Sequence, residues 1–156
     1  MDPRVARLNT PEDCEAFAAN ASKRGRPDLA QEARMRAIDL RAEAHGAATD
    51  AEREALAAVY AYEEARSSGK RRRFRANRTW QMIERHGILA AVERAVNRPD
   101  ETIGYTALVE MGLEKYAFEA IVLRYPGRFT KEAVARCAER IATWKGSGLY
   151  HSTRNE

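Results

Sequence analysis

The sequence predicts an all-α protein, and three observations support this prediction. Ala, Arg, Glu and Leu, which favour helices, dominate the composition. Nine Gly, five Pro and an aromatic content of 8% leave few residues typical of turns and sheets, and long β-branched runs are missing. With 156 residues, 44% of them hydrophobic, the chain can bury a core as one domain or two very small ones. We therefore expect a compact multi-helix bundle.

Residues 1–67 are predicted to form an N-terminal segment of three helices. Thr10 and Pro11 provide a cap and a first helical residue, and Gly25-Arg26-Pro27 separates this helix from the next. The second helix ends near His45-Gly46, and the short connection predicts an antiparallel hairpin. Thr49-Asp50 then begins a third helix, which continues to about Ala65.

The segment from Ala16 to Leu40 resembles one tetratricopeptide-type helical pair. Small residues face one another, a turn falls at Gly25, and Ala37-Ile38-Asp39-Leu40 lies near the end of the second helix. No second copy follows at the 34-residue period of such arrays. The resemblance implies similar helix packing without the peptide-binding groove, because one pair cannot form that concave surface.

A basic loop at 68–79 joins this segment to a C-terminal cluster of short helices at 80–145. Residues 70–98 carry nine Lys/Arg and two Asp/Glu, a balance of +7, whereas residues 1–69 carry −3 and residues 99–156 carry 0. Asn77 or Thr79 is the expected cap of the first C-terminal helix, and Gly87 predicts either two short helices or a kink. Residues 146–156 are polar and are predicted to be a disordered tail.

The basic loop is the strongest candidate binding site. Arginine binds phosphates and guanine edges in a bidentate manner and aromatic rings stack on bases, so cations interleaved with aromatics favour nucleic acid, DNA before RNA. Such contacts would be largely independent of sequence. Trp80 is assigned to the core, because Met82 and Ile83 continue its face. The predicted contact residues are Lys70, Arg71, Arg72, Arg73, Phe74, Arg75, Asn77, Arg78, Arg85, Arg94 and Arg98.

The same charge pattern has two other interpretations. One is a solvated loop in an arginine-rich sequence, since 22 of the 27 basic residues are Arg. The other is a helical protein-interaction module, adaptor or inhibitor, in which the N-terminal hairpin docks a partner and the basic loop meets an acidic surface on it. Either a nucleic acid or an acidic protein is therefore the expected partner.

A helix-turn-helix from about Gly104 to Arg124 is a second candidate site. Gly112 stands where the motif needs its turn glycine, and Leu108 and Phe118 occupy positions that should be apolar. Glu114 and Glu119 in the second helix would, however, face a polyanion. This spacing is also that of an ordinary short helical corner.

No motif predicts catalysis, a metal or a cofactor. His45 and His86 fall at helix ends, and Glu63 and Glu64 are explained by a solvated helix face. Cys14 and Cys137 lack CxxC or Cys/His spacing and are expected to be small buried hydrophobes in a reducing compartment. Without a signal-like segment or 18 consecutive apolar residues, the chain is predicted to be cytoplasmic, with no membrane partner.

Overall fold

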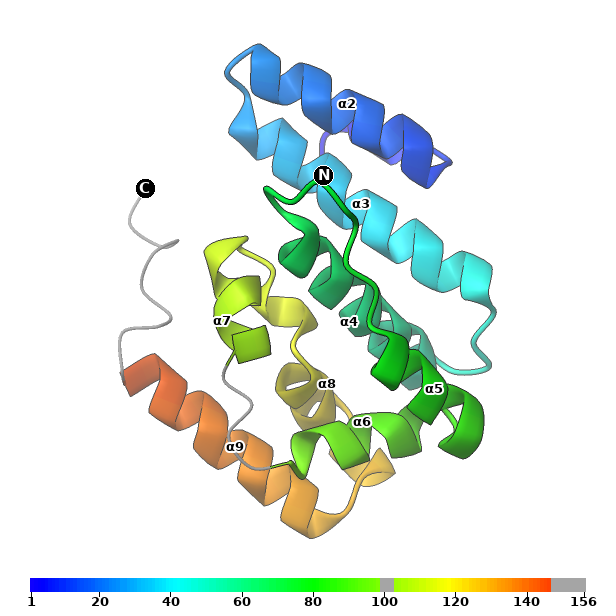
Figure 1. The fold of residues 1–156 in the computed structure, drawn as a ribbon, viewed down its shortest axis with the longest axis vertical. Helices are drawn as coiled ribbons and strands as arrows, with labels where there is room; N and C mark the ends of the chain where they lie inside the picture. Colours follow the sequence, from blue (N-terminus) through cyan, green and yellow to red (C-terminus); the bar gives the residue numbers. More distant parts are fainter. Residues whose placement is uncertain (99–102, 147–156) are drawn as a thin grey trace. The chain divides into compact units, whose positions relative to one another are not determined.

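The computed structural model describes residues 1–98 and 103–146, and all regular elements in that part are helices (Figure 1). This confirms the all-α prediction. The chain forms two compact units, Met1–Ala47 and a second that begins at Ala48. The third predicted helix, grouped above with the first two, thus belongs to the second unit. None of the helices in the described ranges combines the length and apolar character needed to cross a membrane.

The first unit contains α1 (Pro3–Ala6), α2 (Pro11–Lys23) and α3 (Pro27–His45). The predicted cap of α2 is confirmed, because the Thr10 hydroxyl accepts a hydrogen bond from Asp13 N at 3.1 Å. α3 ends at Gly46, which adopts a left-handed conformation. The α2–α3 antiparallel hairpin is also confirmed, and Figure 1 shows the two helices side by side.

The short helix α1 was not predicted, because four residues carry too little periodicity to reveal a helix. Asp2 caps it by accepting from Arg4 N at 2.9 Å, and the Arg4 guanidinium also donates to this carboxylate. These hydrogen bonds lower the pKa of Asp2 to about 2. Val5, fully buried, fixes α1 to the rest of the unit. The hairpin core contains Ala21, Leu29 and Ala30 with Phe17 packed against them.

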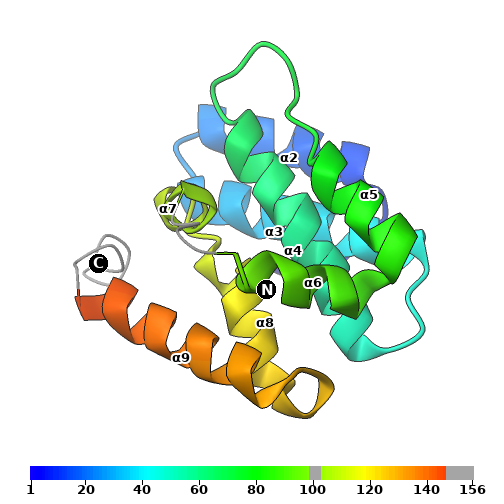
Figure 2. The same ribbon diagram turned by 60° about the horizontal axis from the view of Figure 1, so that its bottom comes forward.

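The second unit is built around α4 (Asp50–Ser67), which packs against α6 (Ile88–Val96), α7 (Ile103–Glu110) and α8 (Phe118–Arg124). Figure 2 shows this group of helices from a second direction. The remaining elements are α5 (Asn77–His86), α9 (Lys131–Gly146) and the 3-10 turns η1 (Glu114–Tyr116) and η2 (Pro126–Arg128). The prediction of a disordered tail concerns residues 146–156, of which 147–156 lie outside the described residues.

Small residues allow the helices of this unit to pack closely. Ala55, fully buried in α4, belongs to a core cluster with Val92, Val96 and Val122. A Cβ atom at Gly104 in α7 would lie only 3.1 Å from Cε2 of Tyr62 in α4. Glycine at this position therefore allows the ring of Tyr62 to lie against the backbone of α7.

Helix α9 is attached by the buried side chains of Ala133 and Cys137 and by several polar and aromatic contacts. Trp144 stacks on Tyr105 of α7 with ring centroids 3.9 Å apart, and Arg140 lies 3.6 Å from the buried carboxylate of Glu119 in α8. At the start of α9, Glu93 of α6 accepts a hydrogen bond from Thr130 N at 2.7 Å. These contacts hold α9 against α6, α7 and α8.

The two-helix alternative predicted at Gly87 is confirmed. α5 ends at His86 and α6 begins at Ile88, and Gly87 between them has φ 90° and ψ 165°. Only glycine readily adopts this backbone region.

We expect Gly87→Ala to lower the free energy of unfolding by about 1–3 kcal/mol, because alanine is strained at this φ and ψ. Gly127→Ala is the control, since Gly127 has no positive φ and no atom within 4 Å of an added Cβ. It should change stability by less than about 0.5 kcal/mol in urea denaturation followed by circular dichroism. Equal stability of the two variants would contradict the assignment.

The two cysteines should be inert in the native protein. Cys14 and Cys137 are fully buried, one in each unit, and burial raises the pKa of both thiols, that of Cys137 to about 12. Because the thiolate is the reactive form, an aromatic disulfide reagent at pH 8 should leave both unmodified and should label both in denaturing urea. Rapid labelling of either cysteine without urea would contradict this structure.

Candidate nucleic-acid interface

The basic loop occupies residues 68–76, between the end of α4 and the start of α5. Lys70, Arg71, Arg72 and Arg73 lie at its tip, and all four side chains are exposed, as is that of Arg75. The loop has no regular secondary structure beyond a turn in which Lys70 N donates to Ser67 O at 3.1 Å. The cations therefore project from an irregular segment and not from a helix face.

The second half of this loop is fixed to α4 by two side chains. The Ser67 hydroxyl donates to the Glu63 carbonyl at 2.6 Å and accepts from Phe74 N at 2.9 Å. The Glu63 carboxylate accepts from Ala76 N at 2.8 Å and from the Trp80 indole N–H at 2.9 Å, both at Oε2. The chain that follows the loop tip is thus attached to α4 at two backbone groups, Phe74 N and Ala76 N.

Two sequence-based expectations were wrong at this place. Glu63, expected on a solvated face, is 5% exposed, because its carboxylate binds the returning chain. Neither Asn77 nor Thr79 caps α5, whose N-cap residue is Ala76 with no side-chain cap. The Ala76 N–H that precedes the helix is bound instead by Glu63.

The aromatic residues of the loop region are partly buried. Phe74 meets the ring of Tyr62 edge-on at 5.5 Å, and the Arg66 guanidinium carbon lies 5.1 Å from the centre of the Phe74 ring. Trp80, which the sequence assigned to the core, is only partly buried; it lies 5.1 Å from the ring of Tyr60 and donates to Glu63. Phe74 therefore helps to hold the loop on α4 and has one face of its ring engaged within the protein.

The predicted cations differ in their surroundings. Arg73 forms an ion pair with Glu64 at 3.2 Å. Within residues 1–98 and 103–146, no ion-pair partner is found for the remaining loop cations or for the exposed Arg78, Arg85 and Arg94. Arg98 follows α6, where its Nη2 donates to the Met82 sulfur at 3.4 Å. The loop cations that have no ion-pair partner among the described residues are Lys70, Arg71, Arg72 and Arg75.

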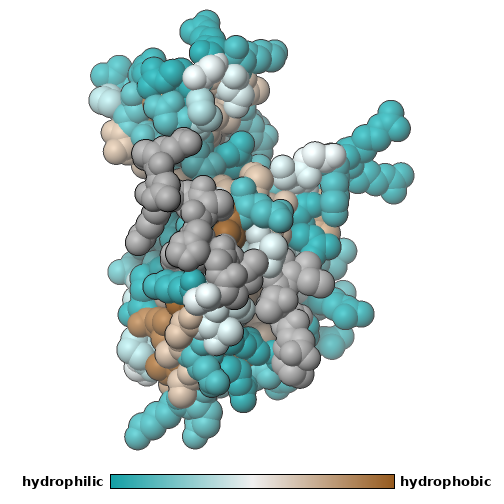
Figure 3. Space-filling model, turned by 90° about the vertical axis from the view of Figure 1, so that its left-hand side faces the viewer, coloured by the Kyte–Doolittle hydropathy of each residue, from teal (hydrophilic) through white to brown (hydrophobic). Residues whose placement is uncertain are grey.

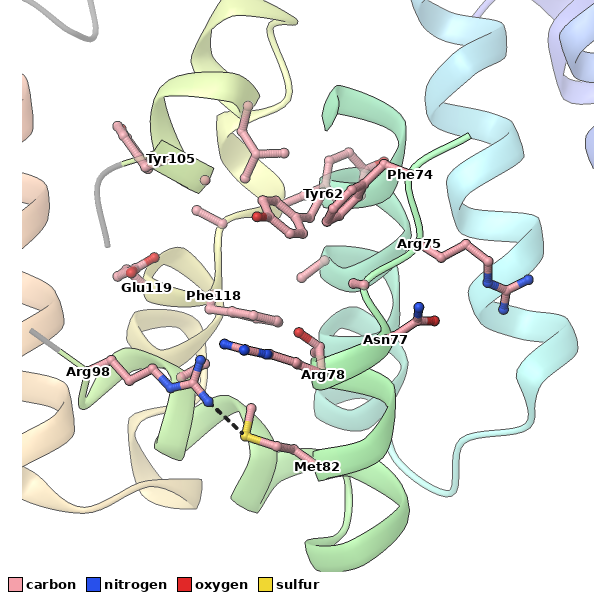
Figure 4. Close-up of a pocket in the computed structure, with 18 residues that line it drawn as sticks. Tyr62, Phe74, Arg75, Asn77, Arg78, Met82, Arg98, Tyr105, Phe118 and Glu119 are labelled. Carbon is pink, nitrogen blue, oxygen red and sulfur yellow. Dashed lines mark hydrogen bonds between the residues drawn. The ribbon is translucent and has the colours of Figure 1, made fainter. Parts of the chain in front are cut away.

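A cavity of about 380 Å³ lies directly beside the loop and was not predicted. Loop residues Phe74 and Arg75 line it, followed by Asn77 and Arg78 at the start of α5. Figure 4 shows Arg78 and Phe118 pointing toward one another across it. Other predicted cations, Arg85 and Arg94, are not part of its wall. The aromatic residues of the wall are Tyr62, Phe74, Tyr105, Tyr116 and Phe118.

The segment from Gly104 to Arg124 does not form the helix-turn-helix that the sequence pattern suggested. Gly112 has φ 65° and makes the turn after α7, as the pattern requires. The chain then forms the 3-10 turn η1, becomes extended at Ala117 and enters α8 only at Phe118. Glu119, expected to face a polyanion, is buried. The described residues therefore present no continuous exposed recognition helix in this region.

Histidines and carboxylates do not gather into a recognisable centre in the described part of the chain. No three His, Cys, Asp or Glu side chains there come together as metal ligands. His45 and His86 are exposed at the C-terminal ends of α3 and α5, as predicted.

The surface is mainly hydrophilic. Among the described residues, Met1 is the only large hydrophobic side chain that is exposed, and hydrophilic residues cover most of the coloured surface in Figure 3. Comparison with models of protein families, with curated proteins and with solved structures gave no match. The cations and the cavity are therefore the features that bear on function.

Glu63 should be critical for stability and for the position of the loop. Glu63→Ala removes the acceptor of two N–H groups, and we expect a loss of about 2–4 kcal/mol in the free energy of unfolding. Glu63→Gln keeps an acceptor oxygen without the charge and should cost about 1–2 kcal/mol. Urea denaturation measures both values.

Glu64→Ala is the matched control for this measurement. It removes the neighbouring carboxylate, whose pair with Arg73 is near the surface and worth at most about 1 kcal/mol. Trypsin should also cleave the loop faster in Glu63→Ala than in Glu64→Ala, because the loop loses one attachment. Identical stability and cleavage rates in the two variants would show that the Glu63 bonds do not hold the loop.

Proposed function

We propose that this protein binds nucleic acid, DNA in preference to RNA, through phosphate contacts from the basic loop. The observation that carries the proposal is a set of exposed cations without ion-pair partners in the described residues, on a loop attached at Glu63 and Ser67. Lys70, Arg71, Arg72 and Arg75 make the main contacts. Arg73, which pairs with Glu64, and the helix residues Arg78, Arg85, Arg94 and Arg98 contribute further positive charge.

The attachments of the loop favour phosphate binding. A free arginine-rich chain loses much conformational entropy when it binds, whereas a loop fixed at Phe74 and Ala76 is already confined. The balance of +7 over residues 70–98 also attracts a polyanion and releases its condensed counterions on binding. Recognition through these contacts alone is independent of base sequence.

The character of the surface favours nucleic acid over an acidic protein. Protein interfaces usually contain a desolvated core of apolar and aromatic side chains. The described residues expose no large hydrophobic side chain except Met1, whereas exposed cations surround the loop. A charged polymer with a regular phosphate spacing suits such a surface better.

A triple substitution in the loop tests the proposal. Arg71→Gln, Arg72→Gln and Arg75→Gln together should weaken binding to a labelled DNA at least tenfold, measured by fluorescence anisotropy. The slope of log affinity against log salt should also become shallower by about 0.9 for each duplex phosphate contact that is lost. The three side chains are exposed, so the fold should persist.

The matched control is Arg7→Gln, Lys23→Gln and Arg24→Gln, which removes the same charge from exposed positions of the first unit. Affinity and salt slope should stay close to those of the unchanged protein. The proposal fails if both triple variants have the same effect, or if a pull-down with the unchanged protein still retains a partner protein after nuclease treatment.

A further inference from the structure

The cavity beside the basic loop has the size and lining of a site for one small planar ligand. Its volume of about 380 Å³ falls at the lower end of the range for ligand pockets, roughly 300–1,000 Å³. Every lining residue belongs to the second unit, so the cavity is complete within one compact part of the chain. The wall combines Tyr62, Tyr105, Tyr116 and Phe118 with Met82.

The space exists because small residues stand where larger side chains would fill it. Ala58, Ala95 and Gly104 all line the cavity. Because Gly104 has no Cβ, the ring of Tyr62 can lie close against α7, where it forms part of the wall. Aromatic rings around an unfilled volume offer flat faces for stacking.

Several polar groups that line the cavity come from the end of the basic loop and the first turn of α5. Arg75, Asn77, Arg78 and Thr79 all line it and follow the loop cations within nine residues of Lys70. In Figure 4, Arg78 and Phe118 point toward one another, from α5 and α8. Arg78 is exposed and has no ion-pair partner in the described part of the chain. It is therefore available to bind an anion at the edge of an aromatic site.

We infer that the cavity holds one nucleobase of a single strand whose neighbouring phosphates lie on the basic loop and on Arg78. The inference rests on the proposed function. It explains why an aromatic cavity and a row of cations share the residues Phe74 to Arg78, since a nucleotide combines a flat apolar base with an anionic group. Stacking on aromatic side chains accepts any base and strengthens binding to unpaired strands. A duplex must first unpair and unstack a base, so the cavity favours single strands.

The test uses the full chain and a short single-stranded DNA that carries one 2-aminopurine, a base whose fluorescence falls when it stacks. Phe118→Leu keeps apolar volume and removes the aromatic face. Fluorescence should be quenched on binding to the unchanged protein, and Phe118→Leu should lose most of the quenching and weaken single-strand affinity about fivefold to tenfold. Affinity for duplex DNA should stay the same.

Phe129→Leu is the matched control. Phe129 packs against the same core cluster as Phe118 but does not line the cavity, so a general loss of packing should affect both variants equally. Quenching and single-strand affinity should remain unchanged in Phe129→Leu. If the two variants behave alike while the loop triple variant still weakens binding at least tenfold, the inference about the cavity is overturned and the proposed function stands. If the loop triple variant binds normally, the proposed function itself has failed.

Two further measurements do not depend on these variants. Photo-crosslinking of a strand that carries 5-iodouracil, followed by peptide mapping, should modify Tyr62, Tyr105, Tyr116 or Phe118, and crosslinks confined to other residues would overturn the inference. Deoxyadenosine monophosphate should compete with the strand only at concentrations at least a hundredfold above the strand's Kd, because it lacks the loop contacts. Competition by the mononucleotide near the strand's Kd would mean that the cavity takes a free nucleotide, contrary to the inference.

Discussion

The Glu63 carboxylate is the interaction on which the arrangement of the second unit depends. A buried carboxylate is costly unless hydrogen bonds satisfy its oxygens, and Glu63 is 5% exposed. Its Oε2 accepts from Ala76 N and from the Trp80 indole, which brings the end of the basic loop and the first turn of α5 back to α4. The start of α5, with Asn77 and Arg78, is thereby placed beside the cavity.

The hydrogen bonds to Glu63 also explain why positive charge is tolerated next to the core. Only the backbone of Ala76 and the indole of Trp80 are drawn inward, while the arginine side chains on either side remain in water. Ser67 acts similarly on Phe74 N, so the loop is attached through backbone donors that every residue type except proline would supply. The exposed side chains of Lys70, Arg71, Arg72 and Arg75 are consequently not needed for these attachments.

Local signals in the sequence predicted most helix boundaries, because caps and glycine turns act within a few residues. Thr10, Thr49, Gly46 and Gly87 all mark ends that the structure contains. Local signals could not show that Glu63 is buried and Glu64 is not. The two residues are neighbours on one helix and point in different directions, and Glu63 is buried because the chain returns to it at Ala76, 13 residues later.

The cavity was beyond sequence analysis for a related reason. Its wall extends from Ala58 to Glu119 and combines residues of the five helices α4 to α8, so no local spacing reveals it. The helix-turn-helix prediction failed to anticipate the break at Ala117, whose extended backbone is followed by the buried residues of α8. Charge could be located from sequence because it depends on composition, whereas a hollow depends on which small side chains come together.

Loop and cavity would contribute to binding through different physical terms. Phosphate contacts weaken steeply with salt, because the release of counterions that drives them is less favourable at high salt. Stacking of an uncharged base on Phe118 and the tyrosines changes little. Total affinity would therefore fall as salt rises, while the advantage supplied by a stacked base would persist. A protein with both features would bind duplexes and single strands at low salt and would favour unpaired strands at higher salt, with no need for base-specific hydrogen bonds.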